Sequence, residues 1–289
     1  MDAPPNATGG FPYSRWAKYA FLAALLLGAA YLLGLQCRQI AARYQIIFQA
    51  PGDILPLAFS ITMATLLVLL AVSIAAALVR PIGLALLFVA GSCAALLAGW
   101  EFSSTPAILS AVYLLFAGFY LRAVTRELEA RLDFSVASLC RGHTTLLLAL
   151  GFLLSGSLYT ALAGHIEREG LHIPAQVRAD VLDMVESQFE AREAPPGGRA
   201  EDKETQLAQV RSELNRQMDE LEQRLEPLKP YAPAIGAFFM LEFLYVVFFL
   251  LGLLKIPALL LWAILKLLRQ SGFIREVVRT ATVRRVVIA

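Results

Sequence analysis

Long apolar runs dominate the chain, and polar segments of varied length separate them. A membrane hydrocarbon core about 30 Å thick is crossed by roughly 20 residues of helix. Six runs near this length occur, at residues 19–36, 54–79, 82–100, 106–121, 144–164 and 234–254. None has lysine or arginine in its interior, and only the last contains an acidic residue. The pattern predicts an all-α, polytopic membrane protein with six transmembrane helices.

The one sizeable polar segment, residues 165–232, has the periodicity of helix. Apolar residues recur along it at heptad spacing. This leucine stripe consists of Leu207, Leu214, Met218, Leu221, Leu225 and Leu228. Three heptads are near the lower limit for a coiled coil. A second amphipathic helix is predicted upstream, from residue 173, and the Pro/Gly-rich stretch 193–199 separates the two. We expect either a helical hairpin that buries both apolar faces or a stripe that packs against another subunit.

The distribution of charge predicts the orientation in the membrane. Residues 165–232 carry nine basic and fifteen acidic side chains, whereas residues 255–289 carry seven basic and one acidic. Because basic residues near span ends favour the cytoplasmic side, both termini are expected there. The predicted organisation is a cytoplasmic tail (1–18), a five-helix transmembrane region (19–164), an extracytoplasmic hairpin (165–232), a sixth transmembrane helix (233–254) and a basic interfacial helix and tail (255–289). A bacterial or archaeal inner membrane is the expected location.

The segment after Lys255 is apolar but too short for a seventh span. Residues 256–268 reach only about 20 Å as helix, and Pro257 interrupts the preceding helix. We expect a helix along the membrane interface with Trp262 at headgroup level, and a re-entrant segment is the alternative. The basic residues expected at the membrane surface are Lys266, Arg269, Arg275, Arg279, Arg284 and Arg285.

Glu242 lies in the middle of the last apolar run. A charge within a membrane is costly, so such a residue indicates function by default. It is a candidate proton or cation site. The alternatives are a neutral Glu242 that donates a hydrogen bond to a serine or threonine of another span, such as Ser73 or Ser155, and a position nearer the interface. Pro227, Pro230 and Pro233 precede this span and predict either an extended connector or simple helix boundaries.

Small residues recur at intervals of four within the run 82–100, a spacing that lets helix backbones approach closely. The two rows are Ala90, Ala94 and Ala98, and Gly91, Ala95 and Gly99. We expect this face to pack against another helix and assign it no chemistry.

Composition and motifs narrow the function without identifying it. The 289 residues are 58% hydrophobic and 17% charged, which excludes an ordinary soluble domain. Three separated cysteines, Cys37, Cys93 and Cys140, indicate neither a disulfide framework nor a zinc site. His143 lies at the inner end of the fifth run, and His165 and His172 are expected to be surface or interfacial residues rather than metal ligands. No phosphate-binding, metalloprotease or hydrolase motif occurs, so no catalytic residue, metal or cofactor is predicted.

These observations favour a non-enzymatic scaffold or assembly component. Its predicted partners are the lipid bilayer and a protein partner or second copy bound through residues 173–228; nucleic acid is not expected. The alternative is a proton- or cation-coupled transporter or channel that uses Glu242.

Overall fold

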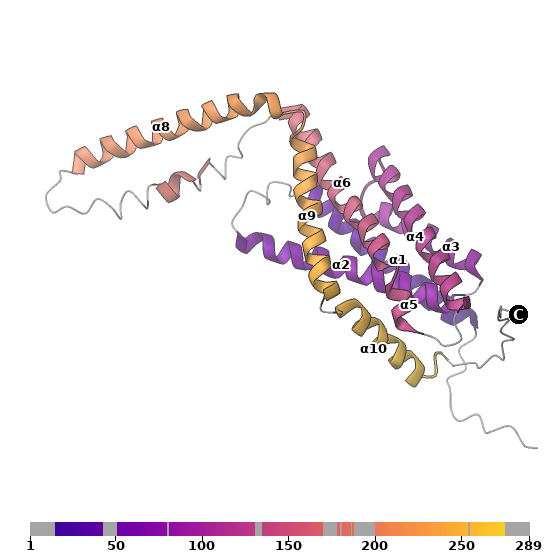
Figure 1. The fold of residues 1–289 in the computed structure, drawn as a ribbon. Coiled ribbons are helices and arrows are strands. Elements are labelled where there is room, and N and C mark those ends of the chain that lie inside the picture. The colour runs from indigo at the N-terminus through magenta and orange to yellow at the C-terminus, as the bar shows by residue number, and fades with distance from the viewer. Residues whose placement is uncertain are drawn as a thin grey trace, which may run out of the picture. The chain divides into compact units, whose positions relative to one another are not determined.

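The structure is a computed structural model that describes residues 15–42, 51–79, 81–130, 135–169, 178–179, 181–185, 187, 200–253 and 255–274. Helices are the regular elements of these residues, and no strand occurs among them (Figure 1). The elements are α1 (Arg15–Ala42), α2 (Pro51–Leu78), α3 (Ile82–Gly99), α4 (Ser104–Ala130), α5 (Val136–Cys140), α6 (His143–Glu169), α8 (Ala200–Leu225), η2 (Glu226–Leu228), α9 (Ala232–Leu253) and α10 (Ile256–Gln270).

Six helical segments are long and apolar enough to cross a membrane, which agrees with the number of spans predicted. They lie in α1, α2, α3, α4, the stretch of α5 and α6, and α9. The fourth predicted run, 106–121, was the shortest, yet α4 has 27 residues. Helix-favouring arginine, glutamate, leucine and alanine continue α4 beyond its apolar part. Glu127 near its end forms an ion pair with Arg141, at 3.1 Å between Oε1 and Nη1.

The chain divides into two compact units. The first unit contains the described residues of Met1–Arg38, Ile61–Leu154 and Leu241–Ala289, and the second those of Gln39–Ser60 and Ser155–Met240. α1, α2, α6 and α9 therefore contribute residues to both. Tyr113 and Tyr120 of α4 are among the largest fully buried side chains of the first unit.

α1 and α3 cross within the first unit with almost no side chain between them. A Cβ atom added to Gly34 would overlap the carbonyl oxygen of Leu96, and one added to Gly99 would overlap the carbonyl oxygen of Tyr31. Such contact between backbones requires glycine on both helices. Half of the predicted packing signature is thus correct: Gly99 is buried and Gly91 contacts Leu27. The other row, Ala90, Ala94 and Ala98, is exposed.

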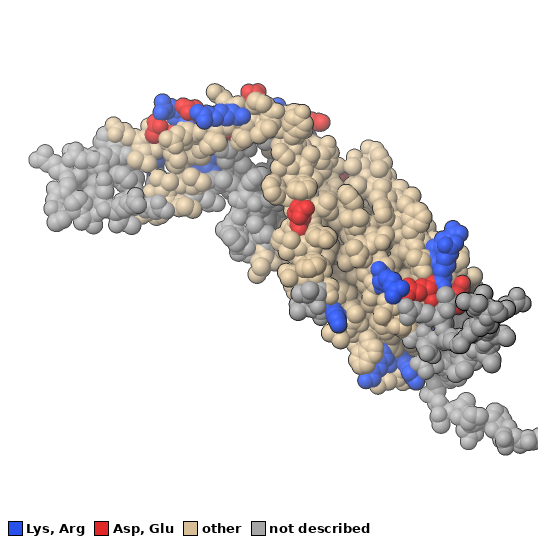
Figure 2. Space-filling view, in the orientation of Figure 1, with Lys and Arg blue, Asp and Glu red and all other residues tan. Residues whose placement is uncertain are grey.

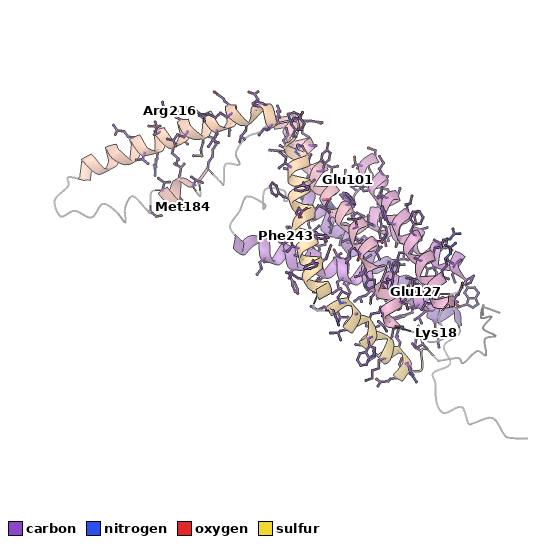
Figure 3. The ribbon with its side chains drawn as sticks, viewed as in Figure 1. Lys18, Glu101, Glu127, Met184, Arg216 and Phe243 are labelled. Atoms are coloured by element: carbon purple, nitrogen blue, oxygen red, sulfur yellow. The ribbon has the colours of Figure 1, made fainter. Side chains whose placement is uncertain are left out.

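The second unit contains α8 and a short helical stretch whose described residues are 178–179, 181–185 and 187 (Figure 3). Arg178 Nη2 lies 2.6 Å from Glu222 Oε1 and 3.0 Å from Asp219 Oδ1, both on α8. Hydrogen bonds to these two carboxylates raise the pKa of the Arg178 guanidinium. This contact places the upstream stretch against α8, as a hairpin requires. The predicted turn at 193–199 lies outside the described residues.

The connection from α8 to α9 is compact, so of the two predictions for the prolines the helix boundaries are correct and the extended connector is not formed. Pro227 lies within η2, and the next residues form hydrogen-bonded turns from Lys229 N to Glu226 O and from Tyr231 N to Leu228 O. α9 then begins at Ala232, with Pro233 at its second position, where a missing N–H costs nothing. The prolines therefore mark helix boundaries.

The helix predicted after Lys255 is present as α10. Lys255 adopts the left-handed conformation, with φ 55°, and separates it from α9. Pro257, Leu261 and Leu265 form the buried face of α10, and α5 is a neighbour of this helix. The opposite side exposes Trp262, over whose ring the Lys266 ammonium lies at 4.8 Å. This two-faced pattern suits the expected interfacial helix.

Candidate functional site

A cavity of about 850 Å³ lies in the first unit, between α2, α5, α6, α9 and α10. Most of its wall is apolar, formed by leucine, phenylalanine, glycine and alanine. Its polar lining residues include His143 and Thr144 on α6, Glu242 on α9 and Lys255 before α10. The volume falls within the roughly 300–1,000 Å³ typical of small-molecule sites.

The cavity extends along α6 and α9. At one end, a Cβ atom on Gly151 would lie 3.1 Å from Leu241 Cδ1, so the two helices are close there. His143 and Thr144 line the cavity at the start of α6, and Gly252 and Lys255 line it at the end of α9. Glu242 is ten residues before Gly252, which is about 15 Å of helix. Along α9 the cavity lining therefore runs from Glu242 to Gly252 and on to Lys255.

His143 belongs to a buried hydrogen-bond network. Its Nε2 lies 2.8 Å from Ser73 Oγ, and Tyr120 Oη lies 3.0 Å from both Ser73 Oγ and the carbonyl oxygen of Leu139. Ser73 Oγ also lies 2.7 Å from the carbonyl oxygen of Leu69. If the single hydroxyl proton of Ser73 is donated to Leu69, then His143 Nε2 must donate to Ser73. Nδ1 is then an acceptor, and it has no hydrogen-bond partner among the described residues.

This network buries His143, which the sequence placed only at the inner end of the fifth predicted span. Its side chain is only 7% exposed, because α2 and α4 supply a hydroxyl network that satisfies one edge of the ring. Ser73 was a proposed partner of Glu242 but pairs instead with His143. The hydrogen bond between Ser73 and His143 joins residues 70 positions apart. The sequence shows only a histidine at the end of a predicted span and does not indicate its partner. Among the described residues, no His, Cys, Asp and Glu group could hold a metal ion.

Glu242 is exposed halfway along α9, and in the described part of the chain its side chain has no hydrogen bond or ion pair. The expected hydrogen bond to a serine or threonine of another span is thus not formed there. Neighbouring Phe243 is 44% exposed and projects outward from the helix (Figure 3). Figure 2 shows an isolated acidic group on the otherwise uncharged surface of α9.

The leucine stripe is only partly covered. Met218 is buried, and Leu214 and Leu225 are half-buried. Leu221 and Leu228 are 50% and 45% exposed. Leu207 lies on α8, and its side chain is outside the described part of the structure. The stripe is therefore buried at Met218 and uncovered at Leu221 and Leu228.

The basic residues predicted at the membrane surface divide into two groups. Lys266 and Arg269 are exposed on α10. Arg275, Arg279, Arg284 and Arg285 lie outside the described residues.

No protein-family model, curated protein or solved structure matches this chain. Function must therefore be argued from the geometry and chemistry of the molecule itself.

Proposed function

We propose that this protein is a non-enzymatic component of a membrane assembly, which binds a second copy or another membrane protein through α9 and α8. The observation that carries the proposal is the exposed, unpaired carboxyl group of Glu242 in the middle of an apolar helix. α9 is also the least covered of the six candidate spans. Of its most apolar stretch, 11% is buried, against 33–72% for the other five.

The energetic argument rests on the difference between apolar and polar surface in lipid. Exposed Phe239, Tyr245 and Phe249 are stable against acyl chains, and they need no protein partner. A carboxyl group among them carries a free-energy cost in lipid, since lipid tails offer it no hydrogen bond. Association with a polypeptide that supplies a polar group to Glu242 removes this cost.

Outside the membrane, α8 offers a second contact. Leu221 is 50% exposed on a helix whose neighbouring positions are charged. An apolar stripe that is only partly buried is typical of a helix that pairs with another helix. Contacts at both α8 and α9 would raise the overall affinity through effective concentration.

Leu221→Asp is the direct test of the contact at α8. An aspartate there places a charge in the apolar contact, and we expect crosslinking of the intact protein in membranes to fall at least about fivefold, equivalent to about 1 kcal/mol. Gln223→Asp is the matched control, because Gln223 is an exposed α8 residue on the opposite side of the helix and receives the same charge. Equal crosslinking of Leu221→Asp and wild type would contradict the role of the stripe.

The alternative, a proton- or cation-coupled transporter or channel, is favoured by a different observation. Glu242 lines a cavity that also contains the ring of His143. Proteoliposomes loaded with a pH-sensitive dye and driven by a membrane potential distinguish the two functions. A transporter would acidify the vesicles and lose this flux in Glu242→Gln. An assembly component would show no such flux in either form, and Glu242→Leu would retain its crosslinked partner less well than Glu242→Gln.

A further inference from the structure

Lys255 carries an unusual combination of features for a residue at a helix junction. It is exposed, it lines the cavity, and its side chain has no ion pair among the described residues. Its left-handed backbone, with φ 55°, is uncommon for a residue with a side chain, and such strained positions cluster at functional sites. The ammonium group is therefore available to a ligand at the end of the cavity where α9 meets α10.

Two further polar groups line the same cavity. Thr144 is exposed and lies next to His143, whose Nδ1 is an acceptor when Nε2 donates to Ser73. A cation, a hydroxyl group and a hydrogen-bond acceptor together match a phosphodiester that also carries a free hydroxyl. Basic pockets between transmembrane helices bind anionic lipid headgroups in this way.

The remainder of the cavity has the dimensions of an acyl chain. It extends about 15 Å along α9 from Gly252 to Glu242, which is half of the roughly 30 Å hydrocarbon core. A lipid of one leaflet with its phosphate at Lys255 would thus place a tail along Leu244, Phe248 and the facing wall of α6. Glu242 lies at the far end and takes no part in holding the headgroup.

We infer that this cavity is a binding site for an anionic phospholipid, whose phosphate pairs with Lys255 and whose acyl chain lies between α6 and α9. The phosphate end of this site, at Lys255, is separate from the partner surface proposed for α8, whereas Glu242, Tyr245 and Phe249 border both the cavity and the exposed side of α9. A bound lipid would fill the gap between these helices and hold Lys255 in its strained conformation.

Lipid retention by the purified, full-length protein tests this site. The protein is reconstituted in bilayers of phosphatidylcholine with added phosphatidylglycerol, extracted in mild detergent, and its retained lipids are counted by native mass spectrometry. Lys255→Gln should lower retained phosphatidylglycerol about fivefold relative to phosphatidylcholine, the effect of one basic residue near a membrane surface. Lys266→Gln is the control, since Lys266 lies against Trp262 and is not part of the cavity wall.

A second pair of variants tests the acyl-chain portion. Gly252 lines the cavity, and a Cβ atom on it would meet nothing within 4 Å, so Gly252→Leu adds an apolar side chain to the cavity wall from a Cβ position that is open. It should reduce retention of both lipids severalfold. Gly28→Leu, also at a position with open space but on α1, should retain them normally.

Two outcomes would overturn the inference. Equal losses in Lys255→Gln and Lys266→Gln would mean that general surface charge holds the lipid, and normal retention in Gly252→Leu would mean that no chain enters the cavity. Lys255→Gly guards against misfolding, because glycine tolerates the left-handed conformation while removing the ammonium group. It should lose phosphatidylglycerol as Lys255→Gln does and remain monodisperse.

Discussion

Gly99→Leu is expected to destabilise the protein by about 3 kcal/mol, the upper end of the cost of overpacking. The added Cβ atom would overlap the carbonyl oxygen of Tyr31, a backbone atom of α1 that cannot move aside as a side chain can. The helices would have to separate, and the close contact of Gly34 with Leu96 would be lost with them. Unfolding in mixed micelles of increasing SDS content, followed by circular dichroism, measures the change.

Gly28→Leu is the matched control for this prediction. Gly28 is on α1 too, but a Cβ atom there meets nothing within 4 Å. Leucine favours helix more than glycine does, so the control should unfold at the same SDS content as wild type or at a higher one. A similar loss of stability in both variants would show that the crossing of α1 and α3 is not the cause.

Ser73→Ala is expected to cost about 2–3 kcal/mol, more than the removal of an ordinary buried hydroxyl. Ser73 Oγ is the shared partner of His143 Nε2 and Tyr120 Oη. Tyr120 retains the carbonyl oxygen of Leu139 at 3.0 Å, whereas the imidazole of His143 is left buried without that partner. An unsatisfied buried polar group carries its full desolvation cost. The same SDS titration measures the effect.

Two further variants, Thr65→Val and a double variant, distinguish the effect of disrupting the network from the effect of removing one buried hydroxyl group. Thr65 is also buried on α2, but its hydroxyl donates only to the carbonyl of Ile61 in its own helix, so valine there should change stability by no more than about 0.5 kcal/mol. Ser73→Ala combined with His143→Phe should recover part of the loss, because both partners are then apolar. Additive losses in the double variant would contradict a coupled network.

The apolar runs predicted the helices well, since the length of a run that must cross lipid is set by the bilayer. The break after Lys255 was also predictable, because Pro257 excludes an uninterrupted helix whatever surrounds it. Both inferences depend on local chemistry alone. Glu242 could also be identified from local sequence alone, because it is an acidic residue in an apolar run.

Contacts between helices were not predictable in this way. Two rows of small residues in α3 have the same spacing, and only the row with Gly91 and Gly99 packs against α1. Choosing between them requires the rotation of the helix about its axis, which depends on its neighbours. The pairing of His143 with Ser73 likewise depends on how α2 and α6 meet. The cavity beside them is lined by several helices, so the sequence of no single helix predicts it.

The contact of Lys18 with Phe273 has a consequence for synthesis of the chain. Lys18 Nζ donates to the carbonyl oxygen of Phe273 at 2.6 Å, and the ring of Phe273 packs edge-on against Phe21. These partners are 255 residues apart. At roughly 5–20 residues per second, α1 is made about 10–50 s before its last partner leaves the ribosome. During that time the first helix lacks these contacts, and this part of the structure forms only when α10 has been completed.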